Sequence, residues 1–298
     1  MRFAVSGDLF PHHVDEFSAA MAARARELGF SGIFTRFDRD DPFATTDAQC
    51  RRVRAILDDH GLTMVQAIGH RPPLIHPDED VRRQAVKTLR AAIRIAAALG
   101  SLSCHTGPGS MAQIGATDTA WAGAWDPHGD NWDPICRAQL VKSLKEVASA
   151  AEDHGVVLGM EGHVLVTLNS AEMMRDVLDE VGSPAVRCDL DPVNWLTLDT
   201  VFRNGPAIDR MCDVLGPRIF NAHAKDVVVE KRLVVHIDER PAGQGILDYD
   251  RFLRRVESLE GAPPGSRFLV IEHASVEQIP AVKAFLDRKA AELGIRVW

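Results

Sequence analysis

The sequence predicts a closed (β/α)₈ barrel, the TIM barrel, with long loops after its fourth and seventh strands. The chain has 298 residues, which is long for most single domains but ordinary for one such barrel. Short apolar or β-branched runs alternate eight times with longer segments of helical period. No strand is left over and no linker interrupts the pattern, so we expect one domain over residues 1–298.

The expected strands are the short runs of this alternation. They lie at residues 2–7, 32–37, 63–69, 101–107, 156–162, 185–191, 218–226 and 267–273. Six of the helical segments end at a glycine, a common helix stop, namely Gly29, Gly61, Gly100, Gly155, Gly182 and Gly216. Thr46, Asp47 and Ser170 stand where helices should begin, and their side chains suit an N-cap.

An open, doubly wound sheet is the alternative that the same alternation allows. Such sheets usually carry a glycine-rich phosphate loop after the first strand. Here SGDLFPHH (residues 6–13) follows the first strand, and neither GxGxxG nor GxxxxGK[ST] occurs in the chain. The closed barrel is therefore favoured.

The composition is that of a soluble globular protein, and we expect neither a nucleic acid nor a membrane partner. The formal net charge is −8, which disfavours general binding to a phosphate backbone. The five cysteines are odd in number and form no CxxC pair, as in reduced cytosolic proteins. The first residues lack the apolar core of a signal peptide, and no apolar run approaches about 18 residues. We expect a cytoplasmic protein.

An ionisable residue stands at or next to the end of every expected strand. In a (β/α)₈ barrel the reacting groups lie at the carboxyl ends of the strands. The residues at these ends are Asp8, Arg36, His70, His105, Glu161, Asp191, His223 and Glu272. A single ionisable residue at a strand end can simply face water, but eight of them at one rim indicate a shared role. This rim is therefore the predicted active site.

The last four of these residues predict a metal site. Glu161, Asp191, His223 and Glu272 end four successive strands, so they should be neighbours around half of the rim. Three carboxylates and one imidazole would repel one another without a cation. This oxygen-rich set favours one divalent ion per chain, with Mn²⁺ expected and Mg²⁺ or Co²⁺ as alternatives. The opposing interpretation is four unrelated residues, each paired with an arginine or lysine.

Motifs around these residues resemble the sugar phosphate isomerase/epimerase family of xylose isomerase-like barrels. The matching stretches are Glu161 in GMEGH, DPVN (191–194), HAKD (223–226), IEH (271–273) and GQGILDY (243–249). The family includes ketose 3-epimerases, hydroxypyruvate isomerase, inosose dehydratases, dehydroshikimate dehydratases and an AP-endonuclease branch. The resemblance covers essentially the whole chain and says little about the substrate.

The resemblance implies that Glu161, Asp191, His223 and Glu272 bind the metal and that Glu161 and Glu272 also transfer protons. A metal that holds a carbonyl and a neighbouring hydroxyl acidifies the adjacent C–H bond and stabilises an enediolate. Carboxylates then remove and return the proton. The expected function is isomerisation or epimerisation of a sugar or related polyhydroxylated carbonyl compound.

Two departures from the family pattern leave other reactions open. Ketose 3-epimerases tend to have histidine where this chain has Asn194, and an arginine beyond the strand-seven histidine where this chain has Lys225, Asp226 and VVVEKR. A lyase that dehydrates a keto-sugar or keto-inositol, or eliminates from a 3-keto-glycoside, is the main alternative. An AP-endonuclease-like phosphodiesterase and a non-enzymatic sugar-binding barrel are more distant.

Seven residues are expected to contact a polyol or keto-sugar substrate. They are Arg36, His70, His105, Trp125, His163, Asn194 and Lys225. For the histidines and the lysine, a structural hydrogen bond or buried salt bridge is the competing role. Arg36 could instead neutralise Asp8 or Asp38.

Two insertions should lie near the site. The loop 108–134 contains three of the five tryptophans, Trp121, Trp125 and Trp132, and is interpreted as a lid over a sugar or as an oligomer contact. Residues 227–243 alternate like a hairpin that could carry His236 to the site.

Asp189 and Asp191 point to the same side of the sixth strand. Asp191 is assigned to the metal because it holds the DPxN position at the strand end. Asp189 lies one layer deeper and should pair with a buried cation or accept hydrogen bonds, although the two roles could be exchanged.

Overall fold

Eight parallel strands form the closed barrel that the sequence predicts. The computed structural model describes residues 1–113, 123–233, 236–259 and 267–298. The barrel strands are β1 (Arg2–Val5), β2 (Gly32–Thr35), β3 (Thr63–Ala67), β4 (Ser103–Thr106), β5 (Val157–Met160), β6 (Val186–Leu190), β7 (Ile219–Glu230) and β9 (Phe268–Ile271). Each lies within or overlaps one of the eight expected runs, and all eight predicted strands are therefore confirmed.

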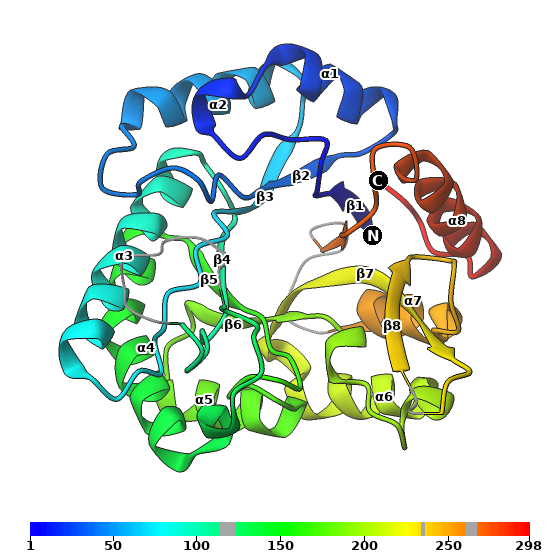
Figure 1. Cartoon of the computed structure of the whole chain (residues 1–298). Coiled ribbons are helices and arrows are strands. Elements are labelled where there is room, and N and C mark those ends of the chain that lie inside the picture. The colour runs from blue at the N-terminus through cyan, green and yellow to red at the C-terminus, as the bar shows by residue number, and fades with distance from the viewer. Residues whose placement is uncertain (114–122, 234–235, 260–266) are drawn as a thin grey trace.

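The sheet closes because both of its ends meet β7. The strand order is β6-β5-β4-β3-β2-β1-β9-β7-β8, and β6 also pairs with β7. Barrel neighbours are parallel throughout, for example Ala222 opposite Leu269 and Leu190 opposite Ala222. Figure 1 shows the helices around this ring of strands. The open-sheet alternative is therefore excluded.

Helices connect the strands and cover the outside of the barrel. They are α1 (Ala19–Glu27), α2 (Asp47–Asp59), α3 (Glu79–Ala98), α4 (Pro134–His154), α5 (Ala171–Val181), α6 (Asn204–Leu215), α7 (Tyr249–Ser258) and α8 (Ile279–Glu292). Thr46 begins α2 with a capping box to Gln49, and Ser170 caps α5 by accepting from the Met173 amide. Gly155 ends α4 in the left-handed region, with φ of 64°, which costs glycine little.

Short 3₁₀ segments shape the loops at the barrel ends. They are η1 (Val14–Glu16), η2 (Gly129–Trp132), η3 (Val193–Trp195), η4 (Val201–Arg203) and η5 (Gly216–Arg218). Of these, η3 matters for the site, because it follows Pro192 and turns the chain immediately after β6.

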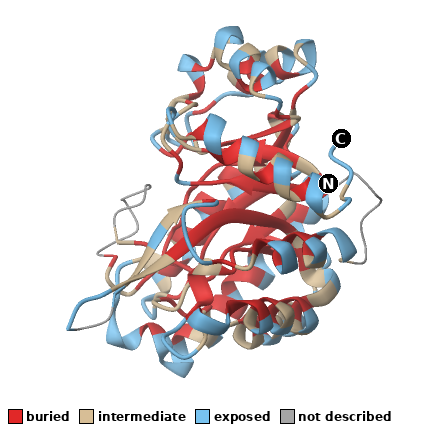
Figure 2. Cartoon of the chain, turned by 90° about the vertical axis from the view of Figure 1, so that its right-hand side faces the viewer, coloured by how far each residue is buried: buried red, intermediate tan, exposed pale blue. Residues whose placement is uncertain are grey.

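Two apolar layers hold the fold together. The main core lies between strands and helices, and buried residues concentrate on the strands and on the inward helix faces (Figure 2). A smaller cluster of Ala4, Phe34, Val65, Phe268 and Val270 is separate from it. Along β9, Phe268 and Val270 alternate with Leu269 and Ile271 of the main core, so the small cluster belongs to the barrel interior. Among the described residues no helix has the length and apolarity needed to cross a membrane.

A hairpin extends the barrel after the seventh strand, as expected. Strand β7 continues to Glu230 and pairs antiparallel with β8 (His236–Pro241). His236 lies opposite Glu230 near the turn and is exposed, so the hairpin does not bring it to the barrel mouth. Glu239, opposite Val227, lies nearer the barrel. Of the tryptophan-rich loop, Trp125 and Trp132 are described, whereas Trp121 lies outside the described residues.

Candidate metal centre and active site

Four buried side chains meet at the carboxyl ends of successive barrel strands. Glu161 directly follows β5, Asp191 directly follows β6, His223 lies within β7 and Glu272 directly follows β9. None has more than 3% of its surface exposed, and one ligand atom from each lies within 4.8 Å of the others. The structure therefore brings together the four residues in which the sequence predicts a metal site.

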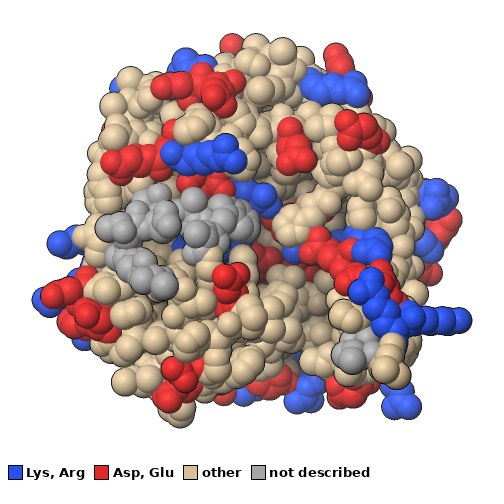
Figure 3. All heavy atoms as spheres, viewed as in Figure 1, with Lys and Arg blue, Asp and Glu red and all other residues tan. Residues whose placement is uncertain are grey.

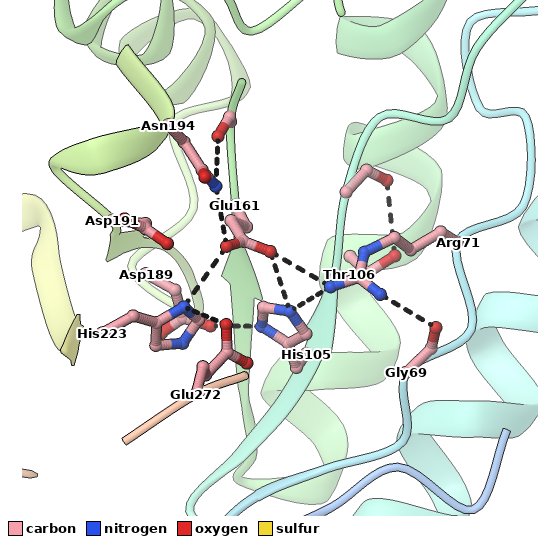
Figure 4. A network of polar contacts seen from close by, with 12 residues as sticks. Gly69, Arg71, His105, Thr106, Glu161, Asp189, Asp191, Asn194, His223 and Glu272 are labelled. Carbon is pink, nitrogen blue, oxygen red and sulfur yellow. Dashed lines mark hydrogen bonds and ion pairs between the residues drawn. The ribbon is translucent and has the colours of Figure 1, made fainter. Parts of the chain in front are cut away.

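His223 stands between the two glutamates. Its Nδ1 atom is 3.3 Å from Glu161 Oε1 and 3.3 Å from Glu272 Oε2. Lys225, two residues further along β7, places its Nζ atom 2.7 Å from Asp191 Oδ2 and 3.5 Å from Glu272 Oε2. Figure 4 shows Glu161, Asp191, Glu272 and His223 converging on one volume.

The carboxylates and cations of this cluster hold one another in their charged forms. Burial opposes ionisation of Glu272, but the charges of His223 and Lys225 outweigh it and keep the pKa of Glu272 well below its usual value. Burial also disfavours the charged form of His223, yet the negative charge of Glu272 and the contact with Glu161 raise its pKa well above the usual value. Before a metal binds, a proton on His223 therefore compensates part of the negative charge.

The residues present fit a divalent metal ion. Three carboxylates and one imidazole carry hard oxygen and nitrogen donors at one point. Glu272 Oε1 is buried and accepts no hydrogen bond from any described residue. A buried carboxylate oxygen without a donor is costly unless something else compensates its charge. A cation beside the other oxygen, Glu272 Oε2, which faces His223, would compensate the charge of the whole carboxylate.

A second polar cluster lies behind His223. Gln66 Nε2 donates to Asp189 Oδ2 at 2.9 Å and lies 3.1 Å from His223 Nε2. His105 Nδ1 is 2.8 Å from the same Asp189 oxygen. Asp189 thus accepts hydrogen bonds in the layer below Asp191, which is one of the two roles expected for it.

Glu161 is held more firmly than Glu272. Its Oε1 atom accepts from Asn194 Nδ2 at 3.0 Å, and its Oε2 atom accepts from Arg71 Nη2 at 3.1 Å. Burial raises the pKa of Glu161, but contacts with His105 and His223 and the charge of Lys225 lower it well below the usual value. Glu161 is therefore a fixed, ionised carboxylate.

Glu161 and Glu272 of the four-residue cluster line a cavity of about 200 Å³. The residues that line it are Arg71, Trp125, Glu161, His163, Leu165, Asn194, Lys225, Glu239, Glu272 and His273. Figure 3 shows acidic and basic side chains together around the hollow at the centre of this face. The cavity suits a small polar molecule with several hydrogen-bonding groups.

Four of the seven expected substrate contacts line this cavity, namely Trp125, His163, Asn194 and Lys225. The other three lie elsewhere: His70 and His105 are buried, and Arg36 lines a smaller hollow beside Asp8 and His12. Substrate contact by these three stays a prediction. Lys225 forms the buried salt bridge expected as its structural role, with Asp191, and it also lines the cavity; substrate contact by Lys225 stays a prediction.

Arg71, Glu239 and His273 line the cavity although the sequence did not single them out. Arg71 follows His70 in the loop after β3, and only the loop conformation decides which of the two side chains turns inward. Glu239 hydrogen-bonds His273 at 2.6 Å and lies 3.5 Å from Lys225 Nζ. The alternation of residues 236–241 in the sequence indicates a hairpin. It does not give the register of that hairpin, which decides that Glu239 lies near the cavity.

Solved structures with the same fold include three whose descriptions name a reaction, a ligand or a metal. A D-psicose 3-epimerase with D-tagatose from Clostridium cellulolyticum H10 is 17% identical, with TM-score 0.71, covering 98% of this chain and 99% of that chain. A xylose isomerase-like TIM barrel protein from Mycobacterium smegmatis in complex with magnesium is 18% identical, with TM-score 0.71. The match covers 98% of this chain and 97% of that chain. A probable 3-DHS dehydratase from Bacillus anthracis is 14% identical, with TM-score 0.69. The match covers 96% of this chain and 98% of that chain.

At these identities the likeness shows the fold alone, while the family follows from the sequence. The model of the xylose isomerase-like TIM barrel family matches residues 22–262. That range contains Glu161, Asp191 and His223, and Glu272 completes the cluster beyond it. The chain therefore belongs to the xylose isomerase-like TIM barrel family.

Proposed function

We propose that the protein is a divalent-metal-dependent isomerase or epimerase of a sugar or related polyhydroxylated carbonyl compound. The observation that carries the proposal is the buried cluster of Glu161, Asp191, His223 and Glu272, two of which, Glu161 and Glu272, line a cavity. Mn²⁺ is the proposed ion, and Mg²⁺ or Co²⁺ would fit the same oxygen-rich set.

The four ligands hold the ion where a substrate carbonyl and its neighbouring hydroxyl can reach it. When bound, the metal polarises the carbonyl and makes the adjacent C–H bond more acidic. A carboxylate of the site, Glu272 or Glu161, takes the proton, while the C–H electron pair forms a carbon–carbon double bond and the carbonyl oxygen gains negative charge. Return of the proton completes the isomerisation or epimerisation.

Other residues of the cavity bind and orient the substrate. Lys225 Nζ, 3.5 Å from Glu272 Oε2, can donate to a substrate oxygen close to the reacting carbon. Trp125 offers an indole face beside Arg71, whose guanidinium lies 5.0 Å from the ring centre. Aromatic faces pack well against the apolar side of a sugar ring and exclude water from it.

A lyase is the second candidate, because the same proton removal can be followed by loss of a β-hydroxyl group. One solved structure of this fold is described as a probable dehydratase. The two reactions differ in product mass, since isomerisation and epimerisation leave the mass unchanged whereas dehydration removes one water.

The proposal is tested by incubating the Mn²⁺-loaded protein with a panel of keto-sugars and cyclitols, including D-fructose and D-tagatose, and analysing the products by mass spectrometry and NMR. We expect a product of unchanged mass. Chelation with EDTA should abolish turnover and added Mn²⁺ should restore it. A product lighter by one water would replace the isomerase with the lyase, and full activity of a verified metal-free sample would refute metal dependence.

Single substitutions localise the activity. Glu161→Gln, Asp191→Asn and Glu272→Gln should each lower kcat by at least about 10³-fold, because each removes a charged ligand or base. Glu277→Gln is the matched control: Glu277 is exposed, and its side chain contacts Ser275. It should retain the activity of the unmodified protein.

A further inference from the structure

The two glutamates beside His223 differ in what holds their second oxygen atom. Glu161 Oε1 and Glu272 Oε2 both lie 3.3 Å from His223 Nδ1. The other oxygen of Glu161 accepts a hydrogen bond from Arg71. The other oxygen of Glu272 accepts none from the described residues, and Arg36 Nη2 lies 3.9 Å from it, beyond hydrogen-bonding distance.

Arg71 is itself held in place by two residues behind it. Its Nη2 atom lies 2.7 Å from His105 Nε2, and His105 Nδ1 lies 2.8 Å from Asp189 Oδ2. His105 Nε2 also lies 3.3 Å from Glu161 Oε2, so His105 contacts both members of the Arg71–Glu161 pair. Figure 4 shows the result, with Glu161 between Arg71 on one side and His223 on the other.

The cluster of His105, Asp189 and His223 is better explained as a hydrogen-bond network that positions neighbouring side chains than as a second metal site. His105, Asp189 and His223 have ligand atoms close enough to hold an ion. However, the amide nitrogen of Gln66 lies 2.9 Å from Asp189, 3.1 Å from His223 and 3.3 Å from His105. The volume that an ion would need is therefore filled by a hydrogen-bond donor.

We propose that His105 and Asp189 are positioning residues that hold Arg71 against Glu161, so that Glu161 serves as a metal ligand and Glu272 alone moves the substrate proton. This inference rests on the proposed function and narrows it. The contact from Arg71 occupies the oxygen that Glu161 would need as a base, whereas the corresponding oxygen of Glu272 stays available.

A single base restricts the outcome of the reaction. Glu272 Oε1 takes the proton from the carbon next to the carbonyl, the C–H electron pair becomes part of a carbon–carbon double bond, and the carbonyl oxygen takes the negative charge. The hydroxyl proton on the first carbon moves to the former carbonyl oxygen. The protonated Glu272 then returns its proton to the former carbonyl carbon, while the double bond becomes a carbonyl at the first carbon. Because one carboxylate serves one face of the substrate, the hydrogen moves along that face and no centre is inverted.

The first experiment uses Mn²⁺ alone, measured by titration calorimetry. His105→Phe keeps the ring but removes both nitrogen atoms, so Arg71 and Glu161 lose their support and Mn²⁺ affinity should fall about 10-fold or more. His105→Gln keeps an acceptor for Arg71 and a donor for Asp189, and should recover most of the affinity.

Ser103→Ala is the matched control for this measurement. Ser103 is buried two residues earlier on β4, and its hydroxyl donates to the backbone oxygen of Val65. Its loss should leave Mn²⁺ affinity unchanged. Wild-type affinity in a folded His105→Phe variant, verified by circular dichroism, would overturn the positioning role.

The second experiment follows proton exchange in D₂O by ¹H NMR, with D-fructose and D-tagatose as probes and saturating Mn²⁺. The two C1 hydrogens of each sugar give separate signals. The wild type should exchange one of them and Glu272→Gln neither. Arg71→Met, which removes the hydrogen bond from Arg71 to the second oxygen of Glu161, should exchange both. Exchange of both hydrogens by the wild type, or persistent exchange in Glu272→Gln, would overturn the single-base assignment.

The two experiments separate failure of the inference from failure of the proposed function. If the wild type binds Mn²⁺ but exchanges no hydrogen from any keto-sugar of the panel, the proposed function is refuted, together with the role of Glu272. The calorimetry would still decide whether His105 and Asp189 act through Arg71 on Glu161.

Discussion

In the proposed metal site, a proton and the metal ion would compete for His223. Burial opposes its charge, but Glu272 and Glu161 raise the pKa of His223 well above the usual value before metal binds. A raised pKa means that the proton is still bound at neutral pH and is lost only as the pH rises further. Since only the neutral imidazole can ligate a metal, metal binding must release this proton.

We therefore expect Mn²⁺ affinity to increase with pH through the neutral range, by up to about tenfold per pH unit for one released proton. Calorimetry in two buffers of different ionisation enthalpy measures the number of protons released. A pH-independent affinity between pH 6 and 8, with no proton release, would contradict the role of His223 as ligand.

Lys225 is the cation that neutralises Asp191 when no metal is bound. Its Nζ atom is 2.7 Å from Asp191 and 3.5 Å from both Glu239 and Glu272. Burial alone would lower the pKa of Lys225, but the negative charges of Asp191 and Glu272 raise it well above the usual value. Removing this lysine leaves buried carboxylates without compensation.

Lys225→Met should thus destabilise the protein by about 3–5 kcal/mol in EDTA, and by clearly less in saturating Mn²⁺, since the ion then compensates the same carboxylates. Urea unfolding under both conditions measures the difference. Lys283→Met is the control: Lys283 pairs with Asp287 on α8, and its loss should cost the same with and without Mn²⁺. An equal cost for Lys225→Met under both conditions would argue against a metal at Asp191.

At the scale of elements, β5 and β6 are packed around the carboxylate of Asp189. Gly159 of β5 lies so close that a Cβ atom at this position would overlap the Asp189 carboxyl group. The absence of a side chain at Gly159 therefore leaves the space that the Asp189 carboxylate occupies. Two residues later it supplies Glu161 to the metal cluster.

Gly159→Ala should lower the unfolding free energy by about 1–3 kcal/mol through overpacking, and weaken Mn²⁺ binding by displacing Asp189 and its hydrogen-bond partners. Gly129→Ala is the matched control, because no atom of the described residues lies within 4 Å of the methyl group added at that position. Thermal unfolding and calorimetry of both variants test the expectation. A Gly159→Ala protein as stable as the wild type would show that β5 can move away from Asp189.

The hairpin of β7 and β8 shows how one element can extend a site. Strand β7 carries His223 and Lys225 in its barrel portion and then continues beyond the barrel. Its partner β8 returns Glu239 to within 3.5 Å of Lys225, and Glu239 hydrogen-bonds His273 next to Glu272. His273 adopts a φ of 52°, an uncommon conformation for a residue other than glycine, at the point where the hairpin and the end of β9 meet.

At the scale of the whole molecule, the candidate metal cluster joins residues from four barrel strands. Glu161, Asp191, His223 and Glu272 come from or directly follow β5, β6, β7 and β9, so an ion bound to them links half of the barrel. A ligand that binds only the folded state stabilises it by mass action. We expect Mn²⁺ at 100 times its dissociation constant to add about 2.7 kcal/mol to the unfolding free energy.

This gain is measured as a shift of Tm that grows with Mn²⁺ concentration and disappears in EDTA. The triple variant Glu161→Gln, Asp191→Asn, Glu272→Gln should show no shift at the same concentrations. A shift of equal size in the triple variant would place the binding of Mn²⁺ elsewhere on the protein.

The barrel and the four candidate metal ligands could be predicted because their signals are local in the chain. The eight strands follow from short apolar runs, and the ligands follow from their position at the strand ends, where parallel strands of a closed barrel must converge. Glu161, Asp191, His223 and Glu272 each stand beside such a run, so no knowledge of side-chain direction was needed to place them together.

Only the tertiary structure decided which polar side chains complete the site. Gln66 and Asp189 are 123 residues apart in the chain, and Arg71 and Glu161 are 90 apart, yet each pair is joined by a hydrogen bond across the barrel. Such contacts depend on loop conformation, hairpin register and the space left by Gly159, none of which leaves a periodic pattern in the sequence. The sequence by itself determined the barrel and its four candidate ligands, and the closure of the barrel determined what surrounds them.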